Sequence, residues 1–225
     1  MGHMVSYPAN GHTTSGYLAL PPGGSGRGVL VVQEWWGLVD HIKDVADRFA
    51  REGFVTLAPD FFHGESTMSP DEAAKLFMAL NIDRAGADLR GSASYVLSRP
   101  EVTGTRVGVV GFCMGGQLAL YAGMAYPDRI GAAVDFYGVH PAVTVDPARV
   151  KTPVLGHFGT RDSSVPVDRV EALARAVTAA GGSFQAHFYE ADHAFFNDTR
   201  PQVYDPGASA LAWERTLEFF RKHLG

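Results

Sequence analysis

The sequence is short of cysteine, of clustered basic residues and of long apolar runs, and each shortage narrows the class of protein. Cys113 is the single cysteine among 225 residues, so no intrachain disulfide can form and a cysteine-based metal site is not expected. This usage favours a reducing, cytoplasmic location. No apolar run approaches the roughly 18 residues that cross a membrane. No basic region followed by an apolar one opens the chain, so we expect no signal peptide.

Charge and composition favour an ordinary folded domain without a nucleic-acid partner. Lys and Arg number 19 against 24 Asp and Glu, and they form no basic stripe that could follow a phosphate backbone. Hydrophobic residues make up 46% of the chain, enough for a large core. The length suits one domain. We expect a monomeric single domain over residues 5–225, with residues 1–4 as a vector remnant and a disordered start.

Strand-like and helix-like segments alternate along the chain. Short apolar runs typical of buried parallel strands occur at Gly28–Val32, Phe54–Ala58, Arg106–Val110, Gly131–Phe136 and Pro153–His157, with a more exposed one at Gln185–Tyr189. Helical patterns occur at Asp40–Arg51, Asp71–Ala79, Asp83–Leu97, Gly115–Ala125, Val167–Ala179 and Ala208–His223. This alternation predicts an α/β fold with a mostly parallel central sheet and helices on both faces. The proline-punctuated stretch Gly138–Val150 is too short for a separate lid domain.

The most informative segment is Gly111-Phe112-Cys113-Met114-Gly115, which lies between a predicted strand and a predicted helix. A G-x-C-x-G pattern in this context predicts a nucleophile elbow, a sharp turn that presents its central side chain at the carboxyl end of the sheet. The flanking glycines let neighbouring backbone pass without Cβ clashes. The helix that begins there favours a thiolate over a thiol. The alternative is that Cys113 is a small buried residue at a strand end.

An elbow nucleophile requires an acid and then a histidine further along the chain. Asp162 follows the predicted strand that begins at Pro153, so its side chain can lie beside the elbow. The alternative is that Asp162 caps a turn or the next helix, as aspartate often does. Asp168 is a rival acid, but it lies inside the following helical pattern.

The candidate base is His193, in the loop Tyr189–Phe195 that follows the last predicted strand. A histidine there can reach the elbow from the carboxyl edge of the sheet. The alternative is a structural loop histidine, because the chain has nine histidines. His140 and His157 are weaker candidates because both precede any plausible acid. Together, Cys113, Asp162 and His193 predict a catalytic triad.

Further motifs accompany the elbow along nearly the whole chain: Gln33–Gly37, Ala58–Phe62, Gly111–Gly116, Phe136–Val139, Phe158–Asp162, Tyr189–Phe195 and Trp213–Leu217. As a set they resemble the dienelactone hydrolase family of the α/β-hydrolase superfamily. The resemblance implies an α/β-hydrolase fold and a role for Glu34 in controlling the ionisation and orientation of the catalytic cysteine. It also implies an oxyanion hole formed by the backbone N–H groups of Trp35 and Met114.

The sequence departs from the family at the two arginines that bind the carboxylate of dienelactone. The stretch His63–Ala74 contains no arginine, and Asn197 stands four residues after His193, where the family has the second. Arg84 and Arg200 are nearby in sequence, although both fit ordinary surface positions. A site without a guanidinium fork binds an anionic lactone poorly. We therefore expect the family's chemistry on a different substrate.

The predicted activity is hydrolysis of a small ester or enol lactone through a thioester on Cys113, with no metal or organic cofactor. The predicted substrate-binding residues are Trp36, Phe61, Phe77, Tyr137, Phe195 and Asn197, although core packing is an equal alternative for the aromatic ones. One rival function is a true carboxymethylenebutenolidase that binds the substrate carboxylate through Arg84 or Arg200. The others are a redox or electrophile sensor that uses a reactive thiol and a non-catalytic binding module on the same fold.

Overall fold

The computed structural model describes residues 1–225 and contains one eight-stranded sheet. The strands lie in the order β1-β2-β4-β3-β5-β6-β7-β8. The strands β3 to β8 are parallel, and β1 and β2 add an antiparallel hairpin beside β4. Their bounds are β1 His3–Ala9, β2 His12–Ala19, β3 Gly26–Val32, β4 Val55–Pro59, β5 Val102–Phe112, β6 Ile130–Phe136, β7 Val154–Gly159 and β8 Phe184–Tyr189.

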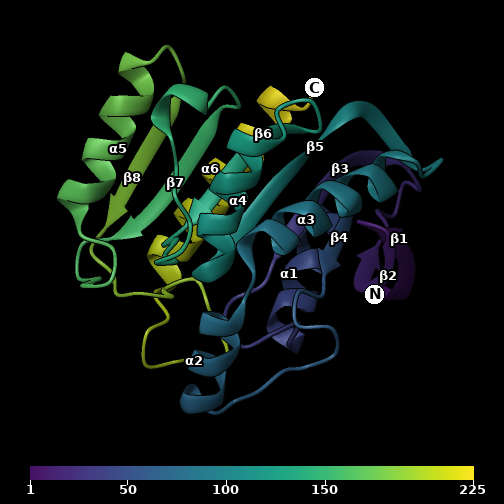
Figure 1. Ribbon diagram of the computed structural model, residues 1–225, viewed down its shortest axis with the longest axis horizontal. Helices are drawn as coiled ribbons and strands as arrows, with labels where there is room; N and C mark the ends of the chain where they lie inside the picture. The colour runs from purple at the N-terminus through teal and green to yellow at the C-terminus, as the bar shows by residue number, and fades with distance from the viewer.

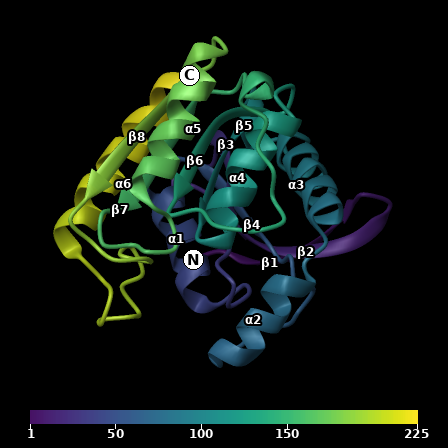
Figure 2. The ribbon, with the colours of Figure 1, turned by 60° about the vertical axis from the view of Figure 1, so that its left-hand side comes forward.

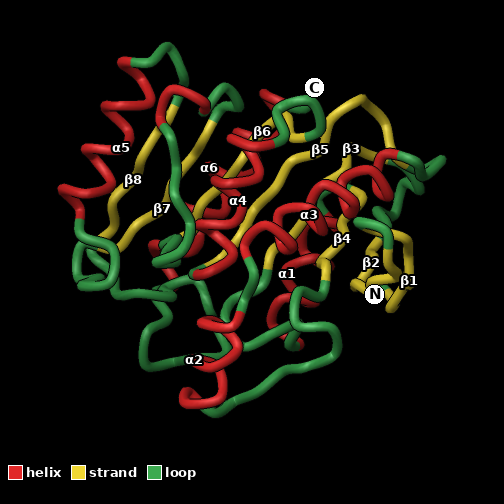
Figure 3. Tube along the Cα trace, in the orientation of Figure 1, coloured by secondary structure: helices red, strands yellow, loops and turns green.

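Six α-helices accompany the sheet: α1 Asp40–Arg51, α2 Pro70–Ala79, α3 Ile82–Leu97, α4 Met114–Ala125, α5 Val167–Ala179 and α6 Pro206–His223, with a short 3₁₀ turn at Pro147–Arg149. The helices α3, α4 and α5 cover one face of the sheet, and α1 and α6 cover the other (Figures 1 and 2). The helix α2 lies apart from both layers, among the loops gathered below the sheet in Figure 3.

Each face of the sheet carries its own hydrophobic core because strand side chains alternate between faces. Leu30 and Val32 of β3 join a cluster of 31 buried residues, whereas Val29 and Val31 join a second cluster of 27. Full burial of one such side chain stabilises the fold by about 1.5–3 kcal/mol. The two cores fix the carboxyl ends of β3 and β5, from which Glu34 and Cys113 follow.

The expected α/β fold is confirmed, and each strand and helix that the apolar pattern predicted is present within a few residues of its expected bounds. The last strand, β8, is partly exposed as expected, because it lies at the edge of the sheet. The structure has no separate lid domain, since the segment between β6 and β7 contains only loops and the 3₁₀ turn. No helix is both long and apolar enough to cross a bilayer.

The hairpin of β1 and β2 was not predicted. Asn10 and Gly11, both with positive φ, form its two-residue turn, and an Asn-Gly pair is a strong signal for such a turn. The expectation of a disordered start over residues 1–4 is wrong for His3 and Met4. Both belong to β1 and pair with Leu18 and Tyr17, so backbone ladder hydrogen bonds hold them in the sheet.

Candidate active site

Cys113 occupies the sharp turn between β5 and α4. Its φ of 54° and ψ of −119° are strained for a residue with a side chain. A Cβ on Gly111 would collide with the carbonyl oxygen of Gly115, and one on Gly115 would lie 2.5 Å from the carbonyl oxygen of Gln33. Both glycines are therefore required by close backbone packing, which is the steric reason for the G-x-C-x-G pattern.

Backbone hydrogen bonds hold the strained turn from both sides. The N–H of Cys113 donates to Phe136 at 3.0 Å, and the carbonyl oxygen of Cys113 accepts from Val139 at 3.2 Å. The N–H groups of Trp35 and Met114 donate to no other protein atom. For Met114 the reason is its position at the start of α4, where an N–H has no acceptor within the helix. One free donor therefore directly follows Cys113, and the other lies just beyond β3, the strand that neighbours β5 in the sheet.

Asp162 and His193 form a direct hydrogen bond, with Nδ1 of His193 2.6 Å from Oδ2 of Asp162. Asp162 lies just beyond β7 and is buried, and its other oxygen accepts from the N–H of Ser164 at 2.8 Å. Burial by itself raises the pKa of this carboxyl, but the hydrogen bonds from His193 and the backbone outweigh it and lower the pKa. Asp162 is therefore an ionised acceptor that fixes one nitrogen of the imidazole.

The environment of His193 favours its charged form. Burial alone lowers the pKa of an imidazole, but the hydrogen bond with Asp162 and the interaction with Cys113 overcome this effect and raise the pKa of His193 to about 10. The ring also packs on Tyr137, with centroids 5.1 Å apart. The three candidate triad residues therefore converge, and the imidazole interacts with both the acid and the thiol.

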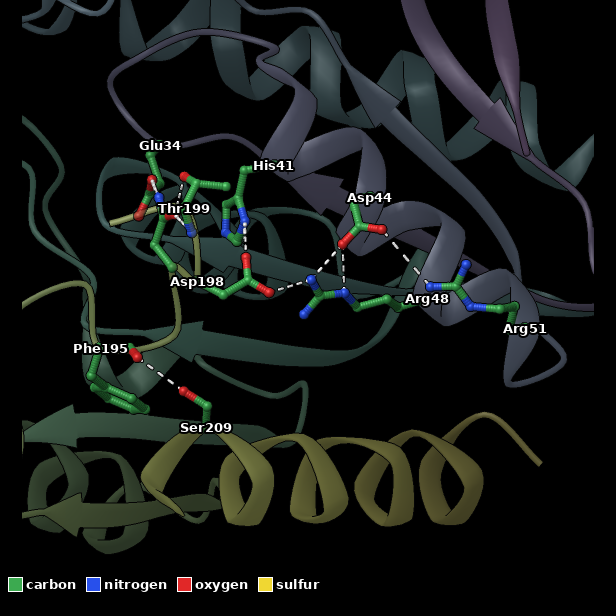
Figure 4. Close-up of polar contacts among 10 residues, drawn as sticks. Glu34, His41, Asp44, Arg48, Arg51, Phe195, Asp198, Thr199 and Ser209 are labelled. Carbon is green, nitrogen blue, oxygen red and sulfur yellow. Dashed lines mark hydrogen bonds and ion pairs between the residues drawn. The ribbon is translucent and has the colours of Figure 1, made fainter. Parts of the chain in front are cut away.

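Glu34 follows β3, and its side chain is buried with a single hydrogen bond to offset the loss of water. Its Oε2 accepts a hydrogen bond from Nδ2 of Asn197 at 2.7 Å, but its Oε1 has no hydrogen-bond partner (Figure 4). Burial raises the pKa of this carboxyl, and Asn197, His193 and Arg200 only partly oppose the effect. Glu34 thus offers one unpartnered oxygen to the cavity that contains Cys113.

The loop after His193 is braced against α1. Asn197 accepts hydrogen bonds from the N–H and the hydroxyl of Thr199, and the neighbouring Asp198 pairs with His41 at 3.3 Å and Arg48 at 2.5 Å (Figure 4). Asp198 is only partly exposed, so these pairs hold the loop more firmly than a fully solvated ion pair does. This bracing fixes Asn197 and, through it, the carboxyl of Glu34.

A cavity of about 390 Å³ opens onto these groups. It is lined by Glu34, Trp35, Trp36, Phe77, Cys113, Val139, Pro141, Ser164, His193, Ala194 and Arg200. Trp35 packs edge-on against Trp36 and Phe77. The walls of the cavity are mostly apolar, and its polar or charged lining residues besides Cys113 are Glu34, Ser164, His193 and Arg200. This composition suits a small organic molecule.

Two of the six predicted substrate-binding residues, Trp36 and Phe77, line this cavity. The other four do not. Phe61, Tyr137 and Phe195 are buried in the hydrophobic cores, where their rings contribute packing. Asn197 is buried behind Glu34 as its hydrogen-bond donor. None of these four is among the residues that line the cavity, so their predicted role in substrate binding stays a prediction.

Arg200 was expected at the surface but lies at the cavity. Its guanidinium stacks on the ring of Trp36, 5.2 Å from the centroid, and it is half-buried. Arg84 is exposed on α3 and does not reach the cavity. Sequence reasoning also missed Val139, Pro141 and Ser164 on the wall, because nothing in a loop sequence indicates which side faces inward.

The rival acid and the two rival histidines lie outside the triad and make other contacts. Asp168 is exposed at the start of α5 and accepts from the N–H of Arg169. His157 is buried between Tyr189 and Thr216, and His140 contacts the carbonyl oxygen of Phe77. The only group of metal-ligating side chains that converges lies outside the cavity, at His12, His63 and Asp88.

Solved structures define the class of protein. A "putative dienelactone hydrolase" from Klebsiella pneumoniae matches with a TM-score of 0.89 and 30% identity, over 99% of this chain and 98% of that one. A dienelactone hydrolase-like promiscuous phosphotriesterase from metagenomic libraries gives a TM-score of 0.88 at 25% identity, over 100% of this chain and 99% of that one. The chain is thus an α/β-hydrolase.

Sequence comparison then narrows the class to a family. The model of the dienelactone hydrolase family matches residues 14–224. Protein usf of Aquifex pyrophilus is 38% identical over 231 residues, and a "putative carboxymethylenebutenolidase" of Aquifex aeolicus is 35% identical over 231, with both chains fully covered in each case. The chain belongs to the dienelactone hydrolase family and is an ester or lactone hydrolase. The resemblance inferred from its motifs is confirmed.

Proposed function

We propose that the protein hydrolyses small esters or enol lactones through a thioester formed on Cys113. The proposal is carried by one observation: His193 interacts with both Asp162 and Cys113 at a cavity of about 390 Å³. An imidazole held between an ionised carboxylate and a thiol is the arrangement that activates a cysteine nucleophile. The strained elbow supports the same role, because backbone strain in folded proteins clusters at functional sites.

In the proposed reaction the thiol proton resides on His193, and Sγ of Cys113 attacks the substrate carbonyl carbon. The C–O bond to the leaving group then breaks, and His193 gives its proton to the departing oxygen. A water molecule next transfers a proton to His193 and attacks the thioester, which releases the carboxylic acid and restores the thiol. Asp162 stabilises the imidazolium in both halves of the reaction.

Two further groups complete the proposed mechanism. The free N–H groups of Trp35 and Met114 are the donors for the oxyanion that forms when the carbonyl carbon becomes tetrahedral. Glu34 lines the same cavity as Cys113, and its buried Oε1 has no hydrogen-bond partner. We assign it to the control of thiol ionisation rather than to attack on the substrate.

Hydrolysis of p-nitrophenyl acetate by the parent and by Cys113→Ala tests the proposal. We expect turnover by the parent and its loss in the variant, with equal unfolding temperatures to show that the fold is kept. Stopped-flow measurement would resolve a burst of p-nitrophenolate if the thioester hydrolyses slowly. Equal turnover in both proteins would remove Cys113 from the mechanism.

One observation favours a narrower second candidate, in which the substrate carries a carboxylate as dienelactone does. Arg200 lines the cavity and lies over Trp36, so a cationic group is available near the thiol despite the missing family arginines. A charge-assisted hydrogen bond to a carboxylate is worth about 1.5–3 kcal/mol, or roughly 10- to 150-fold in binding. A single guanidinium supplies less orientation than two.

Comparison of dienelactone with its neutral methyl ester tests the second candidate. The second candidate predicts that the parent prefers the acid in kcat/KM and that Arg200→Gln loses that preference. Arg84→Gln is the matched control, since Arg84 is exposed and does not line the cavity. A parent that prefers the methyl ester would exclude carboxylate recognition but leave the cysteine mechanism intact.

A further inference from the structure

A second cluster of polar side chains lies outside the catalytic cavity. His12 begins β2, His63 lies in the loop after β4, and Asp88 lies on α3. The possible ligand atoms of the three residues are all within 4.8 Å of one another. Three segments far apart in sequence therefore present two imidazoles and a carboxylate to one point, a convergence that sequence spacing could not reveal.

The cluster contains buried polar atoms that lack partners. Asp88 is 4% exposed, and neither its Oδ1 nor Nε2 of His12 makes a hydrogen bond, although the two atoms are 3.4 Å apart. The side chain of Asn10 interacts with Asp88, and the positive charge of Arg84 also acts on this carboxylate. A buried carboxylate oxygen without a partner costs about 1–3 kcal/mol. An ion at this point would give both unpartnered atoms a partner.

We propose that His12, His63 and Asp88 bind a divalent transition-metal ion, with Zn²⁺ as the best fit. Two imidazole nitrogens and one carboxylate oxygen form a typical zinc set, whereas Ca²⁺ and Mg²⁺ require more oxygen ligands. Metal–ligand distances of about 2.0–2.2 Å place two tetrahedral ligands about 3.4 Å apart. The separation between His12 and Asp88 is 3.4 Å, so this pair is already spaced for the ion.

The third ligand is the adjustable one. His63 is exposed on a turn that Asp60 fixes by accepting hydrogen bonds from the N–H groups of Phe62 and Gly64. Rotation of the exposed imidazole about its side-chain bonds closes the remaining distance without moving the turn. The exposed side of the cluster leaves the fourth coordination position to water.

The ion lies apart from the catalytic cavity, because none of its three ligands lines that cavity. It joins the edge hairpin, the loop after β4 and α3. The same loop continues to Ser66, which bridges to Gly37, and to Thr67, whose N–H donates to the carbonyl oxygen of Trp36 at 3.0 Å. Fixing His63 therefore steadies the segment that leads to the cavity wall.

Titration calorimetry with Zn²⁺ alone as the probe tests the site. We expect one equivalent to bind to the parent, and His63→Ala and Asp88→Asn to weaken the affinity at least ten-fold. His3→Ala is the matched control, since His3 is exposed on β1 and lies outside the cluster. We also expect Zn²⁺ to raise the unfolding temperature of the parent and of His3→Ala but not of His63→Ala.

Two results would overturn the proposal. The first is Zn²⁺ affinity in His63→Ala equal to that of the parent, which includes the absence of binding in both. The second is binding that Cys113→Ala abolishes, because the ion would then sit at the catalytic thiol. Co²⁺ gives an independent reading: nitrogen and oxygen ligands produce d–d bands without the thiolate charge-transfer band that Cys113 would add.

Discussion

Replacing Asp162 by asparagine tests the electrostatic core of the proposed mechanism. The pKa of His193 is about 10 against an ordinary 6.5, which favours the imidazolium by about 5 kcal/mol. Burial opposes the charge, and the interactions with Asp162 and Cys113 together overcome it. If Asp162 supplies half of the net effect, Asp162→Asn removes about 2–3 kcal/mol and lowers kcat/KM by about 30- to 150-fold.

The assay is kcat/KM on p-nitrophenyl acetate, together with the pKa of His193 measured by nuclear magnetic resonance. Asp192→Asn is the matched control, because Asp192 adjoins His193 in sequence but pairs with Arg161 at 3.4 Å. We expect a lower pKa for His193 and a lower rate in Asp162→Asn only. Equal losses in both variants, or an unchanged pKa in Asp162→Asn, would refute the reasoning.

The interaction between His193 and Asp162 also makes the stability of the protein depend on pH, in a direction that can be predicted. The folded state raises the pKa of His193, so its contribution is fully present below about pH 6.5 and is lost as the pH rises through about 10. Asp162→Asn is therefore expected to destabilise the protein most at neutral and mildly acidic pH, with the gap to the parent narrowing near pH 10 and again in strong acid, where Asp162 is protonated. Denaturant unfolding at several pH values measures this gap. A gap that widens towards pH 10 would contradict the assignment.

Three further substitutions address the elbow, the buried carboxyl and the loop brace. Gly111→Ala forces a Cβ against the backbone of Gly115 and is expected to cost about 3 kcal/mol of unfolding free energy, measured by denaturant titration. Glu34→Gln keeps an acceptor for Asn197 but cannot ionise, so we expect about ten-fold lower kcat/KM and a flatter acidic limb in the pH profile. Asp198→Ala removes the partly exposed pairs with α1 and is expected to lower the unfolding free energy by about 1 kcal/mol.

Much of the fold could be predicted because apolar periodicity records burial. The strand Gly26–Val32 contributes side chains to both cores, so it is apolar throughout and easily recognised. The hairpin strand His12–Ala19 is largely polar in its first half and only partly buried, which hides its strand character. Its one clear signal was the Asn10-Gly11 turn, which depends on positive φ rather than on hydrophobicity.

The candidate site also has a part that could be predicted from the sequence and a part that could not. Cys113, Asp162 and His193 follow from a strict chain order that the fold imposes, and the structure brings them together. The cavity wall has no such rule, because an aromatic residue in a loop can face the core or the cavity with the same sequence around it. Phe195 turned into the core, whereas Arg200 returned over Trp36 through the turn that follows Asn197.

Under the proposed mechanism, stability and activity place opposite demands on the backbone of Cys113. A side chain at φ 54° and ψ −119° costs about 1–3 kcal/mol, a cost that glycine largely avoids. The most stable residue for this turn is therefore one that cannot act as a nucleophile. Selection for thermal robustness alone would favour loss of the thiol, so a stabilisation campaign on this enzyme must screen for turnover as well as for melting temperature.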